Sequence, residues 1–229
     1  MVTVISLGGS IVAPDKPDTD FITKYFTLLQ RYLNTDKNRK VVLVIGGGGP
    51  ARVYQKAFRE IIPESESSEQ DWIGIMATRL NAQLIKAVFT DYCTQPVVTD
   101  PTIIHDIKDQ VLVAAGWKPG FSTDFDAVVL AENLGADTVM NLSNIEKVFT
   151  ADPKVDPSAE PVDAMSWKDF RQMVGDEWVP GKNTPFDPVA AKKASEMGLK
   201  VIVAGGKDIE NIEKILTGKD FFGTTIGPE

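Results

Sequence analysis

The sequence predicts a three-layer α/β/α sandwich built around a mostly parallel sheet. Short, nearly continuous runs of β-branched and apolar residues alternate with longer helix-like stretches along the whole chain, which is the order of elements in a parallel sheet covered on both faces. Each run is closed by glycine or by a polar turn residue, as expected of a buried strand. With 229 residues, of which 43% are hydrophobic, the chain can form one large domain or at most two modest ones.

Five apolar runs are expected to form strands. The first ends at a Gly-Gly pair, and the second ends at four consecutive glycines, after which Pro50 is expected to open a helix because proline is favoured at the first helical position. Apolar residues in the 71–91 stretch recur at helical spacing, so this helix should pack by one face. The expected strands are 2–7, 41–45, 111–115, 138–142 and 201–204, and the expected helices are 20–34, 50–61, 71–91, 124–135, 166–175, 188–197 and 208–217.

Three segments interrupt this alternation. Residues 63–71 are polar and acidic, and they are expected to form an exposed loop that ends with Asp71 as the cap of the next helix. Residues 149–163 contain three prolines, which exclude a regular helix or a central strand. A further irregular stretch covers 176–188. The proline-containing segment suggests a soft boundary near residue 148 between two portions of one sheet.

Composition and charge exclude several classes of protein. The chain has 24 Lys and Arg against 32 Asp and Glu, a net charge of −8, and its scattered basic residues argue against a nucleic acid partner. Single Cys93 and His105 residues exclude a disulfide framework and a Cys- or His-based metal site. No apolar run reaches the ~18 residues of a membrane-spanning helix, and the N-terminus resembles no export signal. We therefore expect a cytoplasmic protein without a membrane partner.

Glycine-rich turns follow three of the expected strands. Gly8-Gly9-Ser10 follows the first, residues 46–49 follow the second, and the segment GWKPGFSTD at 116–124 follows the third. Ligands of open parallel sheets bind beyond the carboxyl ends of the strands. Glycine lets backbone N–H groups approach an anion, and a helix N-terminus adds a favourable dipole. Three such turns predict a ligand with more than one phosphate, although glycine also serves packing alone in such turns.

A dinucleotide oxidoreductase is one alternative. The residues Gly46-x-Gly48-x-x-Ala51 match a dinucleotide fingerprint, with Glu64 or Glu66 near the place of a ribose-binding acid. That fingerprint also needs a strand just before the acid, where this chain has no β-branched run. The pattern is therefore weak, and tight binding of NAD would identify this class. The chain contains no P-loop motif of the GxxxxGK[ST] type.

A set of motifs resembles the amino acid kinase superfamily. The motifs follow one another in the order of that superfamily and cover almost the whole chain. They are VISLGGS at 4–10, VIGGGGPAR at 44–52, DWIGIxATRLNA at 71–82, PGFSTD at 119–124, LSNIEKVFTADP at 142–153, DPVAAK at 187–192 and GTTI at 223–226. Within the superfamily, the chain is most similar to the compact archaeal-type UMP kinases.

This resemblance implies ATP-dependent phosphorylation of UMP to UDP by a single domain over 1–229. Residues 1–148 would form the phosphate-acceptor portion and residues 149–229 the ATP-binding portion. The resemblance also implies Mg²⁺ carried by ATP and a homo-oligomer, either a hexamer or a dimer. The attacking group would be a phosphate oxygen, so no general base is needed and the lack of a catalytic His or Cys is expected.

The resemblance also implies the site residues, position by position. ATP contacts would come from Ser6, Gly8, Gly9, Ser10, Gly48, Arg52, Ser143, Asn144, Phe149 and Asp152. UMP contacts would come from Gly47, Asp71, Trp117, Lys118, Pro119, Gly120, Phe121, Ser122 and Thr123. Asp124 and Lys182 would be the catalytic residues.

Three of these residues also have a simpler interpretation. Arg52 would bind phosphate oxygens with its guanidinium fork, or it is an exposed helix residue. Asp71 would accept hydrogen bonds from the ribose hydroxyls, or it caps a helix, and the two roles are compatible. Asp124 would orient the phosphate-binding lysines and the metal, or it is an ordinary acidic residue in the first turn of a helix.

The chain departs from the family pattern at cationic positions. Most of these kinases have a lysine where this chain has Ser6, and some have one where it has Gly49. The nucleotide hairpin carries Lys147 in place of a glycine. Lys182, Lys118 and Lys147 are candidate replacements, and Lys182 is favoured because related kinases place a lysine in the corresponding loop. Charge stabilisation dominates such chemistry, so these departures bear on the rate.

Two alternatives remain within the same fold. A catalytically weak or inactive homologue with a storage or regulatory role would bind ATP without forming product. A kinase acting on another small phosphate or carboxylate would show turnover with a different acceptor. Asp71 and the 119–124 loop favour a nucleoside monophosphate.

Overall fold

The computed structural model describes residues 2–64, 66–151, 155–177 and 184–228. A seven-stranded sheet runs through it in the order β3-β2-β1-β4-β8-β9-β7. Strands β1, β2, β3, β4 and β8 are parallel, β9 is antiparallel to β8, and β7 is parallel to β9. The bounds are β1 (Val2–Leu7), β2 (Lys40–Ile45), β3 (Val111–Ala114), β4 (Thr138–Ser143), β7 (Ala164–Ser166), β8 (Lys200–Gly205) and β9 (Thr224–Gly227). The predicted, mostly parallel sheet is confirmed.

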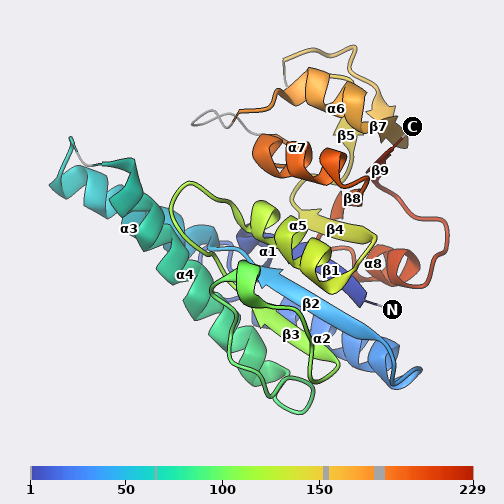
Figure 1. Cartoon of the computed structure of the whole chain (residues 1–229). Helices are drawn as coiled ribbons and strands as arrows, with labels where there is room; N and C mark the ends of the chain where they lie inside the picture. Colours follow the sequence, from blue (N-terminus) through green and yellow to red (C-terminus); the bar gives the residue numbers. More distant parts are fainter. Residues whose placement is uncertain (1, 65, 152–154, 178–183, 229) are drawn as a thin grey trace.

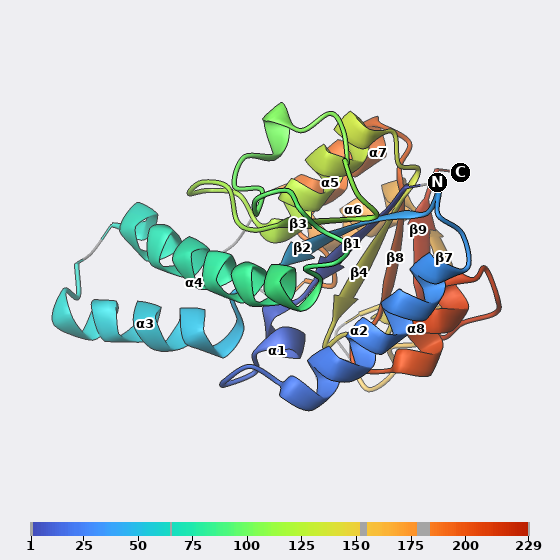
Figure 2. The ribbon, with the colours of Figure 1, turned by 90° about the horizontal axis from the view of Figure 1, so that it is seen from below.

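Helices cover both faces of this sheet (Figures 1 and 2). The helices α1, α2, α4 and α8 pack on one face, and α5, α6 and α7 pack on the other. Helix α3 packs beside α4 and projects with it from the body of the molecule (Figure 2). The bounds are α1 (Gly9–Val12), α2 (Thr19–Asn34), α3 (Gly48–Ile61), α4 (Ser67–Val88), the 3-10 turn η1 (Pro101–Ile103), α5 (Thr123–Leu134), α6 (Trp167–Val174), α7 (Pro188–Glu196) and α8 (Ile209–Leu216). The three-layer prediction is confirmed.

Side chains of the central strands alternate between two cores, because successive residues of a strand point to opposite faces. In β2, Leu43 and Ile45 enter the core beneath α2 and α4, whereas Val42 and Val44 enter the core beneath α5. All four are fully buried. Burial on both faces explains why these strands are continuous apolar runs in the sequence.

The direction in which strands are added to the sheet reverses at β1. From β1 the chain passes to β2 and β3 on one side, and it then returns to β4 on the other side before continuing to β8. The connections on the two sides diverge at the carboxyl ends of β1 and β4. Such a switch point is where open parallel sheets form a ligand-binding crevice.

Two helices begin earlier in the chain than the sequence predicts. Helix α3 begins at Gly48, so Pro50 is its third residue. Helix α4 begins at Ser67 with Glu66 as its N-cap residue, which shortens the expected loop. The prediction that Asp71 caps this helix is wrong, since Asp71 lies in its second turn. Polar residues before Asp71 extend the helix because that end is exposed and needs no apolar pattern.

Several short elements carry no strong hydrophobic pattern and were not predicted. These are α1, β7 and β9, each of four residues or fewer. The strands β5 (Val148–Phe149) and β6 (Pro161–Val162) form an antiparallel ribbon outside the main sheet. Pro161 thus lies in a two-residue edge strand, in agreement with the exclusion of a central strand.

Among the described residues, none of the helices combines the length and the apolar character needed to cross a bilayer.

Candidate functional site

The glycine turns after β1 and β2 meet at the carboxyl edge of the sheet. A Cβ atom at Gly9 would lie 2.0 Å from the backbone nitrogen of Gly48, and one at Gly46 would lie 2.3 Å from that of Gly9. Backbone packing alone therefore requires glycine at these positions. The binding of an anion by these turns stays a prediction, which their convergence at the switch point supports.

A buried side chain of α4 holds the second turn in place. The amide nitrogen of Asn81 donates hydrogen bonds to the carbonyl oxygens of Gly46 (2.9 Å) and Gly47 (3.1 Å). In a trans peptide the C=O and N–H groups point in opposite directions, so the following N–H groups face away from α4. Sequence reasoning quoted Asn81 only as part of a motif and gave it no role. Its signal was an amide on the buried side of an amphipathic helix, where a polar group needs partners.

The loop after α1 closes over Gly49. A Cβ atom at this position would lie 2.1 Å from the carbonyl oxygen of Pro14 and 2.7 Å from the Cα atom of Asp15. A lysine at position 49 would require this loop to move. The departure from the family pattern therefore has a packing reason in this chain.

We expect Gly49→Ala to lower the free energy of unfolding by about 1–3 kcal/mol, because the added methyl group meets backbone atoms that cannot rotate away. Gly227→Ala is the matched control, since a Cβ there would lie 4.0 Å from the nearest atom, Cγ of Lys200. Urea denaturation of both variants provides the comparison. Equal stability of the two would contradict the packing argument.

The loop that follows β3 is held by two side chains of α4. The hydroxyl oxygen of Thr78 accepts a hydrogen bond from the N–H of Gly116 at 2.8 Å. The guanidinium of Arg79 donates to the carbonyl oxygens of Gly116 at 3.4 Å and of Trp117 at 3.0 Å. Sequence reasoning quoted Thr78 and Arg79 only as part of a motif. The structure places both side chains in contact with the loop of residues 116–123, which is predicted to bind the UMP phosphate and is called the acceptor loop.

The structure brings Asp71 and the middle of this loop together, and the binding of UMP by both stays a prediction. The Oδ2 atom of Asp71 accepts a hydrogen bond from the N–H of Gly120 at 3.0 Å. At the end of the loop, the hydroxyl oxygen of Ser122 accepts from the N–H of Phe125 at 3.2 Å and caps α5. The Ser122 hydroxyl can still donate its own proton to a ligand.

The aromatic side chains of the loop pack against one another and against Phe125 of α5. The ring centroids of Trp117 and Phe121 are 5.1 Å apart, and those of Phe121 and Phe125 are 4.6 Å apart. Together with residues of η1 and α5 they line a hollow of about 310 Å³. The ammonium of Lys118 lies 3.8 Å from the centroid of the Trp117 ring, in a cation–π contact.

Ser6 and Asp124 are joined at the carboxyl end of β1. The hydroxyl of Ser6 donates a hydrogen bond to Oδ1 of Asp124 at 2.7 Å. Desolvation raises the pKa of Asp124 to about 6 and the nearby charge of Asp187 adds to this, whereas hydrogen bonds from Ser6 and Asn141 oppose the shift. The position at which most of these kinases are expected to have a lysine therefore holds a hydroxyl that binds the catalytic candidate.

The turns after β1 and β8 are both tied to β4. The N–H of Gly8 donates to the carbonyl oxygen of Leu142 at 2.8 Å, and the N–H of Gly206 donates to that of Ser143 at 2.8 Å. Gly8, Gly9 and Ser10 thus lie beside Ser143 at the switch point. The structure brings these four predicted ATP contacts together.

A hollow of about 290 Å³ opens beyond the ends of β4 and β8. It is lined by Ile11, Ser143, Asn144, Glu146, Gly205, Gly206, Lys207, Asp208, Asn211 and Phe222. Ser143 and Asn144 were predicted as ATP contacts, whereas the turn 205–208 was missed. The signal was present, because Gly205-Gly206 directly follows the strand predicted at 201–204, as the other glycine turns follow theirs.

Lys147 does not serve as a free cation in the described structure. Its side chain is 9% exposed, forms an ion pair with Asp163, and places its ammonium 4.8 Å from the centroid of the Phe222 ring. It therefore stabilises the β5–β6 ribbon against the segment that precedes β9. As a replacement for a phosphate-binding lysine, Lys147 is not supported.

The remaining predicted ATP contacts are less closely defined. Arg52 is exposed on α3 and donates a hydrogen bond to the carbonyl oxygen of Pro14 at 2.9 Å, which leaves further donors of its guanidinium for a ligand. Phe149 is half-buried in β5. Asp152 and Lys182 lie outside the described residues. Within the described residues, no three His, Cys, Asp or Glu side chains form a metal-binding group.

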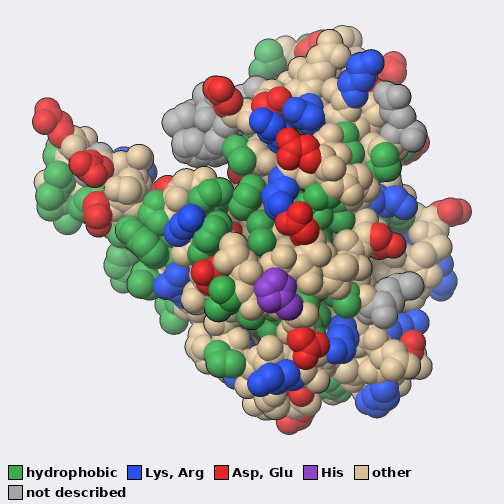
Figure 3. Space-filling view, viewed as in Figure 1, with side chains coloured by type: hydrophobic (Ala, Val, Ile, Leu, Met, Phe, Trp, Pro, Cys, Tyr) green, Lys and Arg blue, Asp and Glu red, His purple; other side chains and the backbone are tan. Residues whose placement is uncertain are grey.

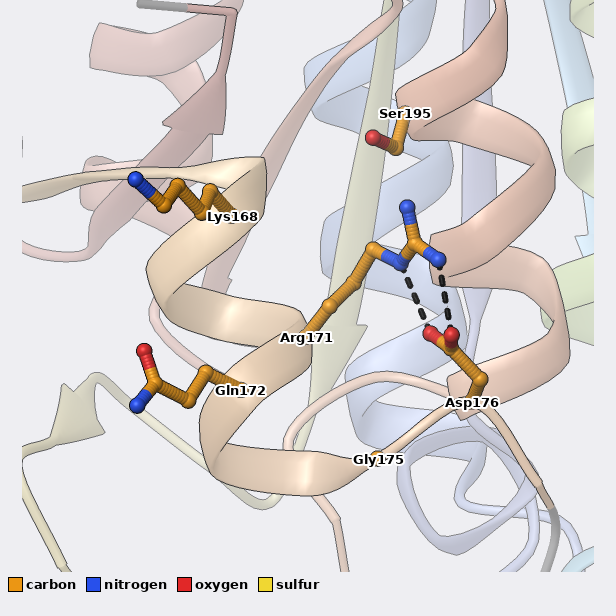
Figure 4. Close-up of a pocket in the computed structure, with 6 residues that line it drawn as sticks. All are labelled: Lys168, Arg171, Gln172, Gly175, Asp176 and Ser195. Atoms are coloured by element: carbon orange, nitrogen blue, oxygen red, sulfur yellow. Dashed lines mark hydrogen bonds and ion pairs between the residues drawn. The ribbon is translucent and has the colours of Figure 1, made fainter.

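A separate hollow of about 380 Å³ lies between α6 and α7 (Figure 4). The guanidinium of Arg171, which lines this hollow, donates two hydrogen bonds of 2.7 Å to the carboxylate of Asp176. The charge of Arg171 is therefore matched within the hollow. None of the predicted site residues is among its lining residues, so it is not the candidate site.

Comparisons with a family model, with known proteins and with solved structures all lead to the same family. Residues 1–205 match the model of the amino acid kinase family. The uridylate kinase of Methanospirillum hungatei is 37% identical over 226 residues, which cover 97% of this chain and 93% of the relative. That of Pyrococcus abyssi is 32% identical, with 100% of both chains covered. The crystal structure of uridylate kinase from Archaeoglobus fulgidus matches with a TM-score of 0.84 at 33% identity, covering 99% of this chain and 100% of that chain.

Proposed function

Since this chain belongs to the amino acid kinase family, we propose that it is a nucleoside monophosphate kinase that transfers the γ-phosphoryl group of ATP to UMP. The products are ADP and UDP. The observation that carries this proposal is the similarity to uridylate kinases over the full length of both chains. The glycine turns that converge at the switch point support it, because a kinase must hold two phosphorylated ligands there.

Phosphoryl transfer needs positioning and charge stabilisation more than a protein base. An oxygen of the UMP phosphate attacks the γ-phosphorus of ATP, and the bond from that phosphorus to the bridging oxygen breaks. We place the ATP phosphates at residues 8–10 and the UMP phosphate at the 116–123 loop. These turns follow β1 and β3, which flank β2 in the sheet, so the β2 turn lies between them.

Backbone N–H groups and a metal ion would supply the positive charge that stabilises the transferred phosphoryl group. The turn after β2 leads into α3, and the loop after β3 leads into α5, so both present helix N-termini to an anion. Mg²⁺ would enter bound to the phosphates of ATP, would keep several water ligands, and would supply positive charge to the transferred group. Arg79 stabilises the acceptor loop through its hydrogen bonds to the carbonyl oxygens of Gly116 and Trp117.

The assay that tests this function follows ADP formation from ATP and Mg²⁺ by the purified protein. Parallel reactions contain UMP, CMP, AMP or no acceptor. Turnover that depends on UMP is the expected result. Turnover only with another acceptor would overturn the substrate assignment, and ATP binding without any turnover would favour the storage or regulatory alternative.

We also propose that the chain forms a homo-oligomer through the projecting arm of α3 and α4. Figure 3 shows apolar side chains gathered on this arm. The exposed apolar residues are Val53, Tyr54, Ile61 and Ile62 on and next to α3, and Trp72, Met76, Leu80 and Leu84 on α4. Those of α4 recur every fourth residue and so form one stripe. The same stripe on a second copy can cover it about a twofold axis.

We expect Leu80→Asp to convert the wild-type oligomer into a smaller species, because it places a charge in the middle of the stripe. Leu80 is 70% exposed, and Ile103 on η1, at 69% exposed, provides a matched control as Ile103→Asp. Size-exclusion chromatography with light scattering measures the mass. A monomeric wild type, or an unchanged mass in Leu80→Asp, would contradict this interface.

A further inference from the structure

Asp126, in the first turn of α5, is a fully buried acid next to the acceptor loop. Its Oδ2 atom accepts a hydrogen bond from the N–H of Trp117 at 3.2 Å. Its Oδ1 atom is buried and has no hydrogen-bond partner among the described residues. Buried carboxylates normally have their oxygens matched by donors, because desolvation of an unmatched one is costly. The second oxygen of Asp126 therefore needs an explanation.

The groups around Asp126 do not neutralise its charge. Asp124 on α5 and Asp100 at the start of η1 both face it and are acidic. On α4, Arg79 donates to loop carbonyl oxygens, and the ammonium of Lys118 lies over the Trp117 ring. Desolvation, followed by these two carboxylates, raises the pKa of Asp126 to about 7.

The acceptor loop is clamped from both faces of the sheet. Thr78, Arg79 and Asp71 of α4 hold it from one side, through Gly116, Trp117 and Gly120. Asp126 holds its first residues from the α5 side, through the N–H of Trp117. A change at residue 126 therefore acts on the geometry of the same loop to which the UMP phosphate is assigned.

We propose that Asp126 is a positioning residue with two opposing effects on acceptor binding. Its hydrogen bond to Trp117 orders the loop for binding, and its buried, unmatched negative charge disfavours a second anion on the same loop. An amide at position 126 keeps the acceptor for the Trp117 N–H and removes the charge, so it should bind UMP more tightly than the natural acid. The inference rests on the proposed function.

The test compares Asp126→Asn with Asp126→Leu in the ADP-formation assay at pH 8. Asp126→Asn should lower the KM for UMP by about threefold or more, since charges interact strongly at low effective dielectric. Asp126→Leu should raise that KM by about fivefold to tenfold, because the Trp117 N–H then has no partner. In both variants the KM for ATP should stay within about twofold of wild type. Asp137→Asn, an exposed change of the same charge, is the control.

Opposite signs for the two variants distinguish positioning from a general loss of structure, which would raise the KM for UMP in both. A KM for UMP that rises or stays unchanged in Asp126→Asn overturns the inference, and this holds even if Asp126→Leu does not fold. Calorimetric titration of wild type with UMP distinguishes a failure of the proposed function from a failure of this inference. A wild type that neither binds nor phosphorylates UMP overturns the proposed function and this inference with it. UMP turnover by wild type with an unaltered Asp126→Asn overturns this inference alone.

Discussion

Replacing Asp124 with asparagine is expected to lower kcat by about two orders of magnitude, the typical cost of removing one preorganised charged group from a reaction centre. Asp124 lies in the first turn of α5, and Ser6 of β1 fixes its carboxylate through a 2.7 Å hydrogen bond. Asparagine keeps the size of the side chain and removes its charge. The KM for UMP should change by less than about threefold, because UMP is assigned to the loop that precedes α5.

The pH dependence of kcat at saturating UMP provides a second readout of Asp124. Desolvation raises its pKa to about 6, so kcat should fall as the pH drops through that value and the carboxylate gains a proton. The hydrogen bond from Ser6 favours the ionised form, and Ser6→Ala should therefore move this acidic limb to higher pH. The assay runs from pH 5 to pH 9. An unchanged limb in Asp124→Asn would show that another group titrates there.

Asp71→Ala is expected to raise the KM for UMP by about tenfold to a hundredfold. The carboxylate accepts the N–H of Gly120 through Oδ2, and its other oxygen is assigned to the ribose hydroxyls. Hydrogen bonds to charged groups are each worth about 1.5–3 kcal/mol, which corresponds to this range of affinity. Steady-state kinetics with varied UMP measure the effect, and Glu69→Ala on the exposed face of α4 is the control.

A deoxyribose acceptor separates the two roles of Asp71. Wild type should discriminate between UMP and 2′-deoxy-UMP, whereas Asp71→Ala should lose most of that discrimination, since the carboxylate that reads the hydroxyl is gone. Asp71→Asn retains an acceptor for the N–H of Gly120, so its discrimination between the two acceptors should lie between those of wild type and Asp71→Ala. An unchanged KM for UMP in Asp71→Ala would rule out the ribose role.

Elements with strong hydrophobic patterns could be predicted from the sequence. The five predicted parallel strands are buried on both faces, and the helices between them are buried on one face. Burial dictates the residue type at each position, so both kinds of element leave a pattern in the sequence. The start of α4 could not be predicted, because its first turn is exposed and its residues suit a helix or a loop equally. Short strands such as β9 depend on a neighbouring strand edge rather than on their own sequence.

The residues of the candidate site divide in the same way. Glycine turns directly after strands were visible in the sequence, because the carboxyl ends of parallel strands share one edge. The carbonyl contacts of Asn81 and the buried carboxyl of Asp126 were not visible, since each depends on the residues that fold over it. For Lys147, the sequence indicates a role that the structure does not support. In the sequence it is a candidate phosphate ligand, and in the structure its charge is matched by Asp163.

The amino-acid sequence alone thus determined the layers of the fold, the edge of the sheet that carries the site, and the family resemblance. Local pattern suffices for these because each strand and helix records its own burial. Only the tertiary structure decided which carboxylate pairs with Lys147 and which residues Ser6 and Gly49 contact. Ser6 meets Asp124 across 118 residues of sequence, and Gly49 lies beneath the loop that contains Pro14. Hydrogen bonds and steric contacts of this kind act over a few ångströms, so they exist only where folding brings distant residues together.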